Sequence, residues 1–271
     1  MLPFRIVSIH GAPRSGTSWL GQIFNSHPDV AFRFQPLFSY RFKGAINPES
    51  SKAETERFFH ELYAVDSDEF ILQTKQRSRG VHPTGMIKLP RPSHLVMKEV
   101  RYHYVIETLL SQIEGIKIIG IVRNPCGAIN SWLKTPREFN PAWDMWSEWR
   151  VAQSKNQGRL EEFFGFDKWM ELASLFLYLS QESPEAFHLV RYEDLVSSPL
   201  SVTERLFSFC GLELPCQTAS FLASSQTTEV DDPDTVFRTP DVAERWENEL
   251  SPDIRDAILC EIRGTELEVF L

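Results

Sequence analysis

Short apolar runs alternate along most of the chain with stretches in which apolar residues recur every three or four positions. The short runs predict strands, and the longer period predicts helices. The predicted strands are residues 5–9, 30–34, 94–100, 116–122 and 187–191. The predicted helices are residues 18–26, 55–63, 102–112, 125–133, 143–154, 166–181 and 201–209, with further helical patterns at 242–247 and 252–262. Strands that alternate with helices favour a mostly parallel sheet with helices on both faces.

No linker, internal repeat or low-complexity tract divides the 271 residues, so we expect one three-layer α/β domain over residues 1–271. Hydrophobic residues make up 42% of the chain, yet no run approaches the roughly 20 apolar residues that a membrane span requires. Residues 2–9 are too short, and interrupted by Arg5, for a signal peptide. These features predict a cytoplasmic protein without a membrane partner, and they leave a homo-oligomer open.

Cysteine spacing and net charge exclude several classes of function. The four cysteines show no CxxC or Cys/His spacing, which predicts reduced thiols and no metal site. A net charge of −9 argues against nucleic acid as a partner and favours a small acceptor. Residues 73–93 depart from this background, because they contain five basic residues and no acid. Near an anionic ligand this segment would form a mobile basic flap; the alternative is a solvated loop.

The stretch HGAPRSGTSWL, residues 10–20, follows the first predicted strand and leads into the first predicted helix. A strand, a tight loop and a helix N-terminus together direct backbone N–H groups at one point, which favours an anion. Gly11 and Gly16 almost fit the nucleotide P-loop GxxxxGK[ST], but Thr17 stands where that motif requires lysine. The positive charge lies instead at Arg14.

The segment PRSGTSWL, residues 13–20, resembles the 5′-phosphosulfate loop of the sulfotransferases, which use 3′-phosphoadenosine-5′-phosphosulfate (PAPS). The alternative is a Gly/Ser-rich loop without a ligand. The resemblance implies a P-loop-like fold and a set of loop residues that bind the cofactor. These residues are Arg14, Ser15, Gly16, Thr17, Ser18 and Trp19.

Two further segments extend the resemblance. Arg123 follows the β-branched run 116–122, and Ser131 lies eight residues later, as in the family's 3′-phosphate site VRNPxxxxxSW. The alternative is an arginine at a sheet edge beside a surface serine. Residues 191–195, RYEDL, resemble the segment whose tyrosine lies near the adenine, which assigns Tyr192 to the cofactor. Arg238 lies where the family often has another basic residue at the 3′-phosphate.

Sulfuryl transfer needs positive charge at the leaving group and a base for the acceptor. The resemblance assigns the first role to Arg14, with Lys98 as a second basic residue. Carbohydrate-type members carry glutamate in a Phe/Tyr-Glu-Pro-Leu segment, but this chain has Gln35 there, and an amide cannot be a base. Glu99 is the expected substitute, followed by His103 and His10. Gln35 and His103 are also expected to contact the acceptor.

Trp143, Trp146 and Trp149 recur at helical spacing. An aromatic face of this kind is typical of core packing, and it can also form a wall for an acceptor. The second interpretation assigns Trp143 and Trp146 to acceptor binding.

Together these motifs predict a PAPS-dependent sulfotransferase that acts on a hydroxyl or amine of a small-molecule acceptor without a metal ion. A carbohydrate O-sulfotransferase is the alternative within the family. A P-loop phosphotransferase lacks its lysine here, and a non-catalytic nucleotide-binding module would account for Gln35.

Overall fold

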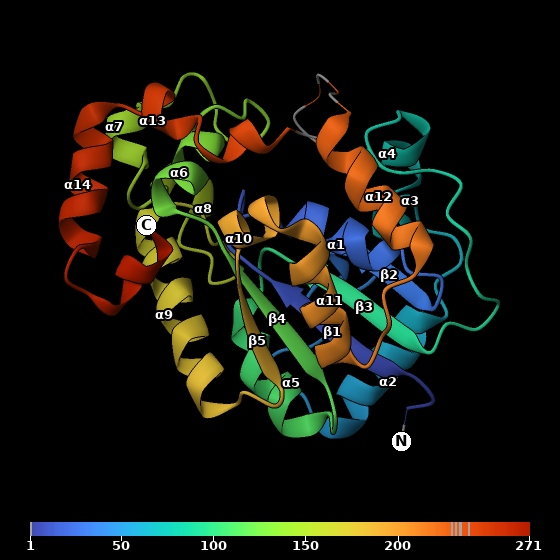
Figure 1. Ribbon diagram of the computed structural model, residues 1–271. Helices are drawn as coiled ribbons and strands as arrows, with labels where there is room; N and C mark the ends of the chain where they lie inside the picture. Colours follow the sequence, from blue (N-terminus) through green and yellow to red (C-terminus); the bar gives the residue numbers. More distant parts are fainter. Residues whose placement is uncertain (1, 229, 231, 233–234, 238) are drawn as a thin grey trace.

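Five strands form one parallel sheet in the order β2-β3-β1-β4-β5, which confirms the predicted parallel α/β fold. The computed structural model describes residues 2–228, 230, 232, 235–237 and 239–271. The strands are β1 (Arg5–His10), β2 (Val30–Phe34), β3 (His94–Glu99), β4 (Lys117–Val122) and β5 (Phe187–Arg191). Every strand lies within one or two residues of its prediction. The amino ends of the strands lie at the lower edge in Figure 1, near the N-terminus, and their carboxyl ends lie at the upper edge.

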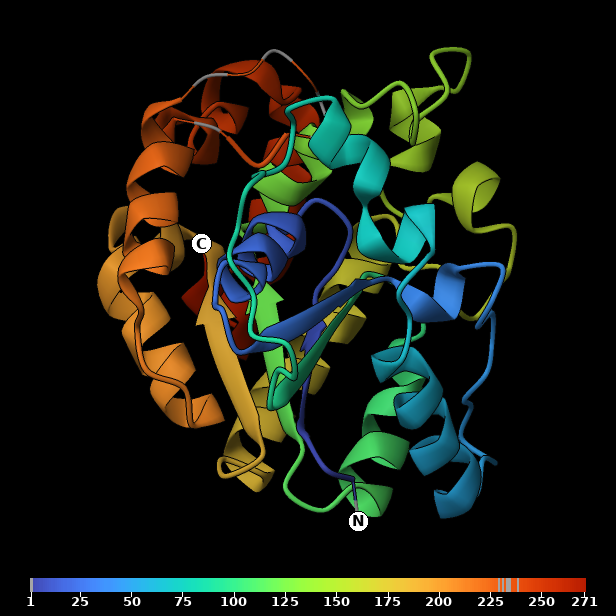
Figure 2. The same cartoon turned by 90° about the vertical axis from the view of Figure 1, so that its right-hand side faces the viewer.

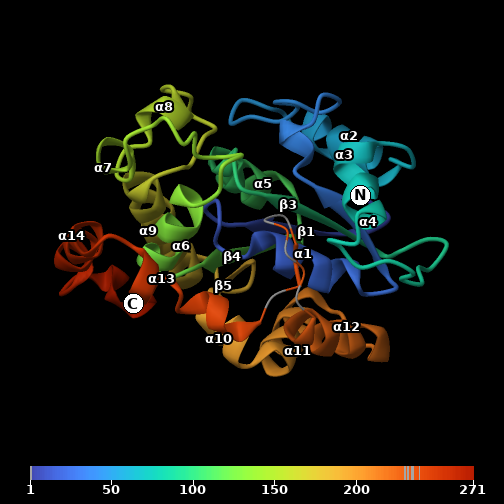
Figure 3. The same ribbon diagram turned by 90° about the horizontal axis from the view of Figure 1, so that it is seen from above.

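Alternate residues of the strands enter two separate cores. Ile6 and Leu95 belong to the core beneath α2 (Lys52–Tyr63), α5 (Ile106–Gln112) and α9 (Phe166–Glu182). Val7 and Val96 belong to the core beneath α1 (Thr17–Asn25), α11 (Pro199–Cys210) and α12 (Cys216–Thr227). Figures 2 and 3 show these two groups of helices on opposite sides of the sheet. A side chain's position along its strand therefore decides which layer it reaches.

Shorter elements surround this frame. The remaining α-helices are α3 (Glu69–Leu72), α4 (Thr74–Ser78), α6 (Pro125–Leu133), α7 (Met145–Glu148), α8 (Gln153–Asn156), α10 (Tyr192–Ser197), α13 (Trp246–Glu249) and α14 (Pro252–Ile262). The 3₁₀ helices are η1 (Pro36–Phe38), η2 (His103–Val105), η3 (Pro240–Ala243) and η4 (Glu266–Phe270). Within the described residues, no helix combines the length and the apolar character that crossing a membrane requires. All four cysteines are free.

The single helix predicted for residues 143–154 is wrong, because the structure has two short helices, α7 and α8, in its place. The carbonyls of Trp149 and Arg150 accept hydrogen bonds from the N–H groups of Phe166 and Asp167 instead of continuing the helix. Ala152 has a φ of 52°, a left-handed conformation that ends the helical path. Contacts with residues distant in sequence thus override the helical spacing of the apolar residues in this segment.

The helical pattern expected over residues 242–247 is split between η3 and α13, and two further elements also differ from the prediction. The helix expected over residues 102–112 begins as 3₁₀ helix η2, because Tyr102 has a φ of 59° and only Ile106 starts the α-helix. Helix α12 was not expected. Its sequence CQTASFLASSQT is rich in Ser and Thr and has few apolar positions from which a helical period could be read.

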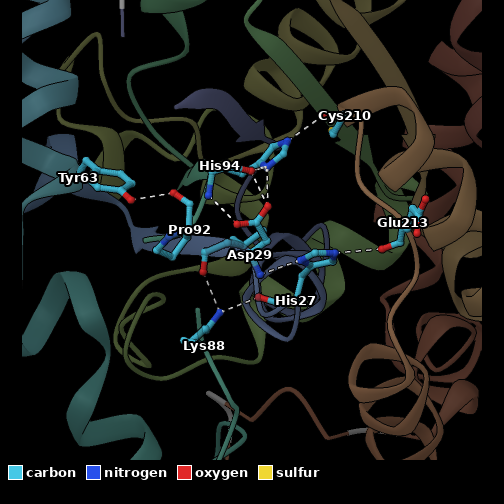
Figure 4. A network of polar contacts seen from close by, with 10 residues as sticks. His27, Asp29, Tyr63, Lys88, Pro92, His94, Cys210 and Glu213 are labelled. Carbon is cyan, nitrogen blue, oxygen red and sulfur yellow. Dashed lines mark hydrogen bonds and ion pairs between the residues drawn. The ribbon is translucent and has the colours of Figure 1, made fainter. Parts of the chain in front are cut away.

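The basic segment 73–93 is anchored to the body of the protein at Lys88 (Figure 4). Its ammonium group donates hydrogen bonds to the carbonyls of His27 and Val30, at 3.1 and 2.9 Å, and to that of Asn25. These carbonyls lie at the end of α1 and the start of β2. Nearby, Asp29 Oδ1 accepts a hydrogen bond from the backbone N–H of Ser93, and Asp29 Oδ2 lies 3.8 Å from Nδ1 of His94. Lys88 thereby fastens the far end of the segment to the strand that follows α1.

We expect Lys88→Met to lower the free energy of unfolding by about 2 kcal/mol, because three carbonyls lose a charged donor while the apolar stem is kept. Urea denaturation measures the change. Lys75→Met in the same basic segment is the control, since Lys75 is exposed and its amino group makes no such contact in the described residues. Equal losses in both variants would contradict the anchoring role of Lys88.

Candidate active site

A cavity of about 740 Å³ opens at the carboxyl edge of the sheet, above β1, β3 and β4. From β1 the chain turns toward β2, whereas from β4 it turns toward β5. The loops that follow β1 and β4 therefore diverge and leave a crevice between them, which is the usual ligand position in open parallel sheets.

The loop between β1 and α1 forms the floor of the cavity. Arg14 and Gly16 both have left-handed backbones, with φ of 69° and 89°. A Cβ on Gly16 would lie 2.4 Å from Cδ2 of Tyr192, so only glycine lets the loop pass beneath that ring. Ser15 Oγ is buried and has no hydrogen-bond partner among the described residues. Ser15 itself is not among the lining residues, whereas Gly16, Thr17 and Ser18, at the N-terminus of α1, line the cavity.

Arg123, at the end of β4, joins three parts of the site. Its guanidinium donates hydrogen bonds to the carbonyl of Arg14, at 3.2 Å, and to that of Val242, at 2.9 Å. Its Cζ lies 4.8 Å from the ring centroid of Tyr192. Burial lowers the pKa of this guanidinium, while Tyr192 and Glu193 act in the opposite direction. Its Nε is buried without a hydrogen-bond partner in the described chain, and an orphaned donor of this kind is what a bound anion would satisfy.

Arg14 connects the loop to helix α6 and to the segment that follows it. Its Nε donates a hydrogen bond to Ser131 Oγ at 3.1 Å, and its Nη1 lies 3.9 Å from Glu138 Oε2. Ser131, expected to share a phosphate with Arg123, is therefore held by Arg14 in this structure. Both arginines and Ser131 line the same cavity.

Aromatic side chains form the wall beside α12. Trp19 and Tyr192 meet edge to face with their ring centroids 6.5 Å apart. The indole N–H of Trp19 donates to Ser225 Oγ at 3.0 Å. Gln226 also lines this side of the cavity. The wall offers flat apolar faces next to amide and hydroxyl groups, which suits a heterocyclic base.

Lys98 and Gln35 lie on the opposite side, at the ends of β3 and β2. The Lys98 side chain is 2% exposed, and its Nζ lies 4.4 Å from the ring centroid of Phe34. Burial lowers the pKa of Lys98 to about 7, with Glu99 acting in the opposite direction. Gln35 Oε1 accepts a hydrogen bond from Arg101 at 3.1 Å, and Arg101 is paired with Glu162 at 2.8 Å. The amide is therefore fixed at the cavity wall.

Positive charge gathers at this cavity although the chain is acidic. The described residues that line it include six basic and three acidic ones: Arg14, Lys98, Arg101, Arg123, Lys134 and Arg245, against Glu138, Asp232 and Glu249. No group of three or more His, Cys, Asp or Glu within the described residues could hold a metal ion. The geometry fits an anionic ligand with an aromatic part.

Comparison with known proteins agrees with this geometry. The model of the Sulfotransferase family matches residues 7–215. This chain belongs to the Sulfotransferase family. It is 25% identical to human carbohydrate sulfotransferase 1, over 92% of this chain and 74% of that protein.

Two solved sulfotransferases share the fold. A mouse sulfotransferase complexed with PAP has a TM-score of 0.59 at 14% identity, covering 98% of this chain and 87% of its own. The sulfotransferase domain of a Synechococcus olefin synthase has a TM-score of 0.56 at 17% identity, covering 97% of this chain and 96% of its own.

The structure of this sulfotransferase does not bring Glu99 to the cavity. Glu99 follows Lys98 on β3 and therefore points into the other layer, where Oε1 accepts a hydrogen bond from Leu37 N at 2.9 Å. Burial raises the pKa of Glu99 to about 8. His10 and His103 lie in the same layer with their Nδ1 atoms 3.0 Å apart. Burial lowers the pKa of His10 to about 3 and that of His103 well below its ordinary value. None of the three lines the cavity.

The tryptophans expected at the acceptor also lie outside the cavity lining. Trp143 packs edge to face on Phe139, with centroids 5.5 Å apart. Trp146 is 55% exposed and lies beside Trp149, with centroids 6.5 Å apart. Their assignment to the acceptor stays a prediction. Arg238 lies outside the described residues, so its assignment stays a prediction.

Several residues at the site were not expected from the sequence of this sulfotransferase. They are Gln73, Gln76 and His82 from the basic segment, Arg101, Lys134, Glu138 and Arg245. The basic segment thus reaches the cavity through two amides and an imidazole, while none of its lysines or arginines is among the lining residues. For Arg101, the signal available in the sequence was its position two residues after the end of β3, at the carboxyl edge of the sheet.

We expect Lys98→Met to stabilise the protein more at low pH than at high pH. The pKa of Lys98 is about 7 in the folded chain and about 10.4 in an unfolded one, so between these values the unfolded chain binds more protons. The stability of the wild type therefore falls as pH drops toward 7. The gain from the substitution should be about 2–3 kcal/mol larger at pH 6 than at pH 9, measured by urea denaturation. If the gain in stability were the same at both pH values, the conclusion that burial lowers the pKa of Lys98 would be wrong.

Proposed function

We propose that this chain transfers a sulfuryl group from PAPS to a hydroxyl of an acceptor that enters the cavity, releasing adenosine 3′,5′-bisphosphate (PAP). One observation carries the proposal. The β1–α1 loop is hydrogen-bonded to Arg123 through the carbonyl of Arg14, and its Gly16 passes directly beneath the ring of Tyr192. The name of the human relative and the PAP bound to the mouse protein support it.

The residues present fit the nucleotide. Ser15 Oγ and Arg123 Nε are buried without hydrogen-bond partners in the described chain, and phosphate oxygens accept hydrogen bonds from such groups. Arg14 and residues 15–18 would hold the 5′-phosphosulfate, and Arg123 and Ser131 the 3′-phosphate. Trp19 and Tyr192 would contact the adenine. The excess of basic over acidic residues in the cavity lining compensates the charge of such a ligand.

PAPS, when bound, supplies a sulfuryl group activated by its bond to phosphate. The guanidinium of Arg14 can stabilise the charge that develops on the leaving oxygen. Lys98 lies at the same cavity, and a nearby anion favours its ammonium form. Gln35, fixed by Arg101, can orient an acceptor hydroxyl through its amide.

A carbohydrate is the acceptor class that we propose. The relatives with this name span most of the chain, and the acceptor side of the cavity offers the Phe34 ring and the amides of Gln35, Gln73 and Gln76. Aromatic faces and amides are suited to rings that carry several hydroxyl groups. Cytoplasmic location and the oligomeric state stay predictions.

Thermal-shift titration with PAP and with ATP, each with magnesium and with EDTA, tests the nucleotide assignment. PAP should raise the melting temperature regardless of EDTA and more than ATP does, because a ligand bound to the folded state stabilises it. Gly16→Ala should weaken PAP binding about tenfold or more, since its Cβ would displace Tyr192. Gly44→Ala is the control: Gly44 also has a positive φ, 62°, but a Cβ there meets nothing within 4 Å.

Turnover is then measured as PAP released from PAPS with a panel of monosaccharides, simple alcohols and phenols. Acceptor-dependent release would support the enzyme. Binding of PAP without release would favour a non-catalytic module, and magnesium-dependent stabilisation by ATP alone would favour a phosphotransferase.

A further inference from the structure

We propose that Glu138 is the general base that removes the proton from the acceptor hydroxyl. This inference rests on the proposed sulfuryl transfer and assigns the role that Gln35 cannot fill. Glu138 lies in the segment between α6 and α7 and lines the cavity together with Arg14, Lys98 and Gln35.

The position of its carboxylate supports the assignment. Oε2 lies 3.9 Å from Nη1 of Arg14, the residue proposed to face the leaving oxygen. That oxygen is buried and accepts no hydrogen bond from any described residue. The side chain is 30% exposed and lines the cavity, and Oε1 also accepts no hydrogen bond from a described residue, so Oε1 is the oxygen that an acceptor hydroxyl can reach. A carboxylate with free acceptor capacity near the reacting position is the group that base catalysis requires.

The other acids of the cavity differ from Glu138 in this respect. Glu249 accepts a hydrogen bond from Asn130 at 2.8 Å and lies 3.1 Å from Lys134 Nζ. Asp232 is bonded to Arg79. Both carboxylates are thus engaged by neighbours. Glu138 has the long contact with Arg14 and no hydrogen bond to Oε2 within the described chain.

Three basic residues from different elements interact electrostatically with the carboxylate. Arg14 lies in the β1–α1 loop, Lys98 at the end of β3 and Lys155 in α8, and the latter two interact electrostatically with Glu138. These charges place the base beside the groups that would also surround the sulfuryl donor. The same basic residues would therefore lie near both the proposed base and the leaving group of the donor.

The step balances as a single displacement. The acceptor oxygen gives its proton to Glu138 and forms a bond to sulfur. At the same time the bond between sulfur and the 5′-phosphate oxygen breaks, and its electron pair remains on PAP. Glu138 then returns the proton to water.

The test compares Glu138→Gln with the wild type, using PAPS and the hydroxyl acceptor that the panel yields. We expect kcat to fall at least a hundredfold while the affinity for PAP stays within about threefold, because the base acts on the acceptor and not on the nucleotide. Asp144→Asn is the control: this carboxylate lies in the same segment, but caps α7 through Ser147 N.

A second acceptor separates a base from a structural role. 4-Nitrophenol is largely ionised by pH 8 without a catalyst, so Glu138→Gln should transfer to it nearly as fast as the wild type. Equal loss with both acceptors, or an unchanged kcat with the hydroxyl acceptor, would overturn the role of Glu138. A wild type that binds PAP but turns over no acceptor would overturn the proposed function instead, and this assignment with it.

Discussion

The buried guanidinium of Arg123 is the interaction on which the site depends. It holds the carbonyl of Arg14 in the β1–α1 loop and the carbonyl of Val242 in the C-terminal part of the chain, beneath the ring of Tyr192. Three segments that are far apart in sequence thereby meet at the end of β4. A buried charge is stable only when it is well paired, so the same contacts that satisfy Arg123 also fix the shape of the cavity. The Nε of the same group has no hydrogen-bond partner in the described chain.

The alternation of side chains along β3 decides which of two neighbouring ionisable residues takes part in chemistry. Lys98 points toward the α1 layer and reaches the cavity, whereas Glu99 points into the other layer with His10 and His103. Both are buried, and burial shifts each pKa toward the neutral form. Only the lysine can meet a ligand. Strong perturbation of a pKa is thus no evidence of a functional role without access to the site.

The frame of the protein follows from local sequence, because each strand is a short apolar run and the β1–α1 loop carries its glycines and Arg14 in one segment. The same holds for Arg123, which directly follows a strand. Residues brought in by long connections could not be predicted. Glu138 and Gln73 reach the cavity through segments without regular period, and the partner of Ser131 depends on the loop conformation at Arg14. Trp143 and Trp146 show the reverse case: they are not among the residues that line the cavity, and a helical spacing also arises from packing alone.

The most direct test is a crystal structure of the protein with PAP bound. We expect the 5′-phosphate over residues 15–18, the 3′-phosphate beside Arg123 and Ser131, and the adenine against Trp19 and Tyr192. Glu138 should then face the side of the 5′-phosphate from which an acceptor would approach. Nucleotide bound elsewhere, for example in the cavity at the amino edge of the sheet beside Arg5 and Lys117, would contradict it.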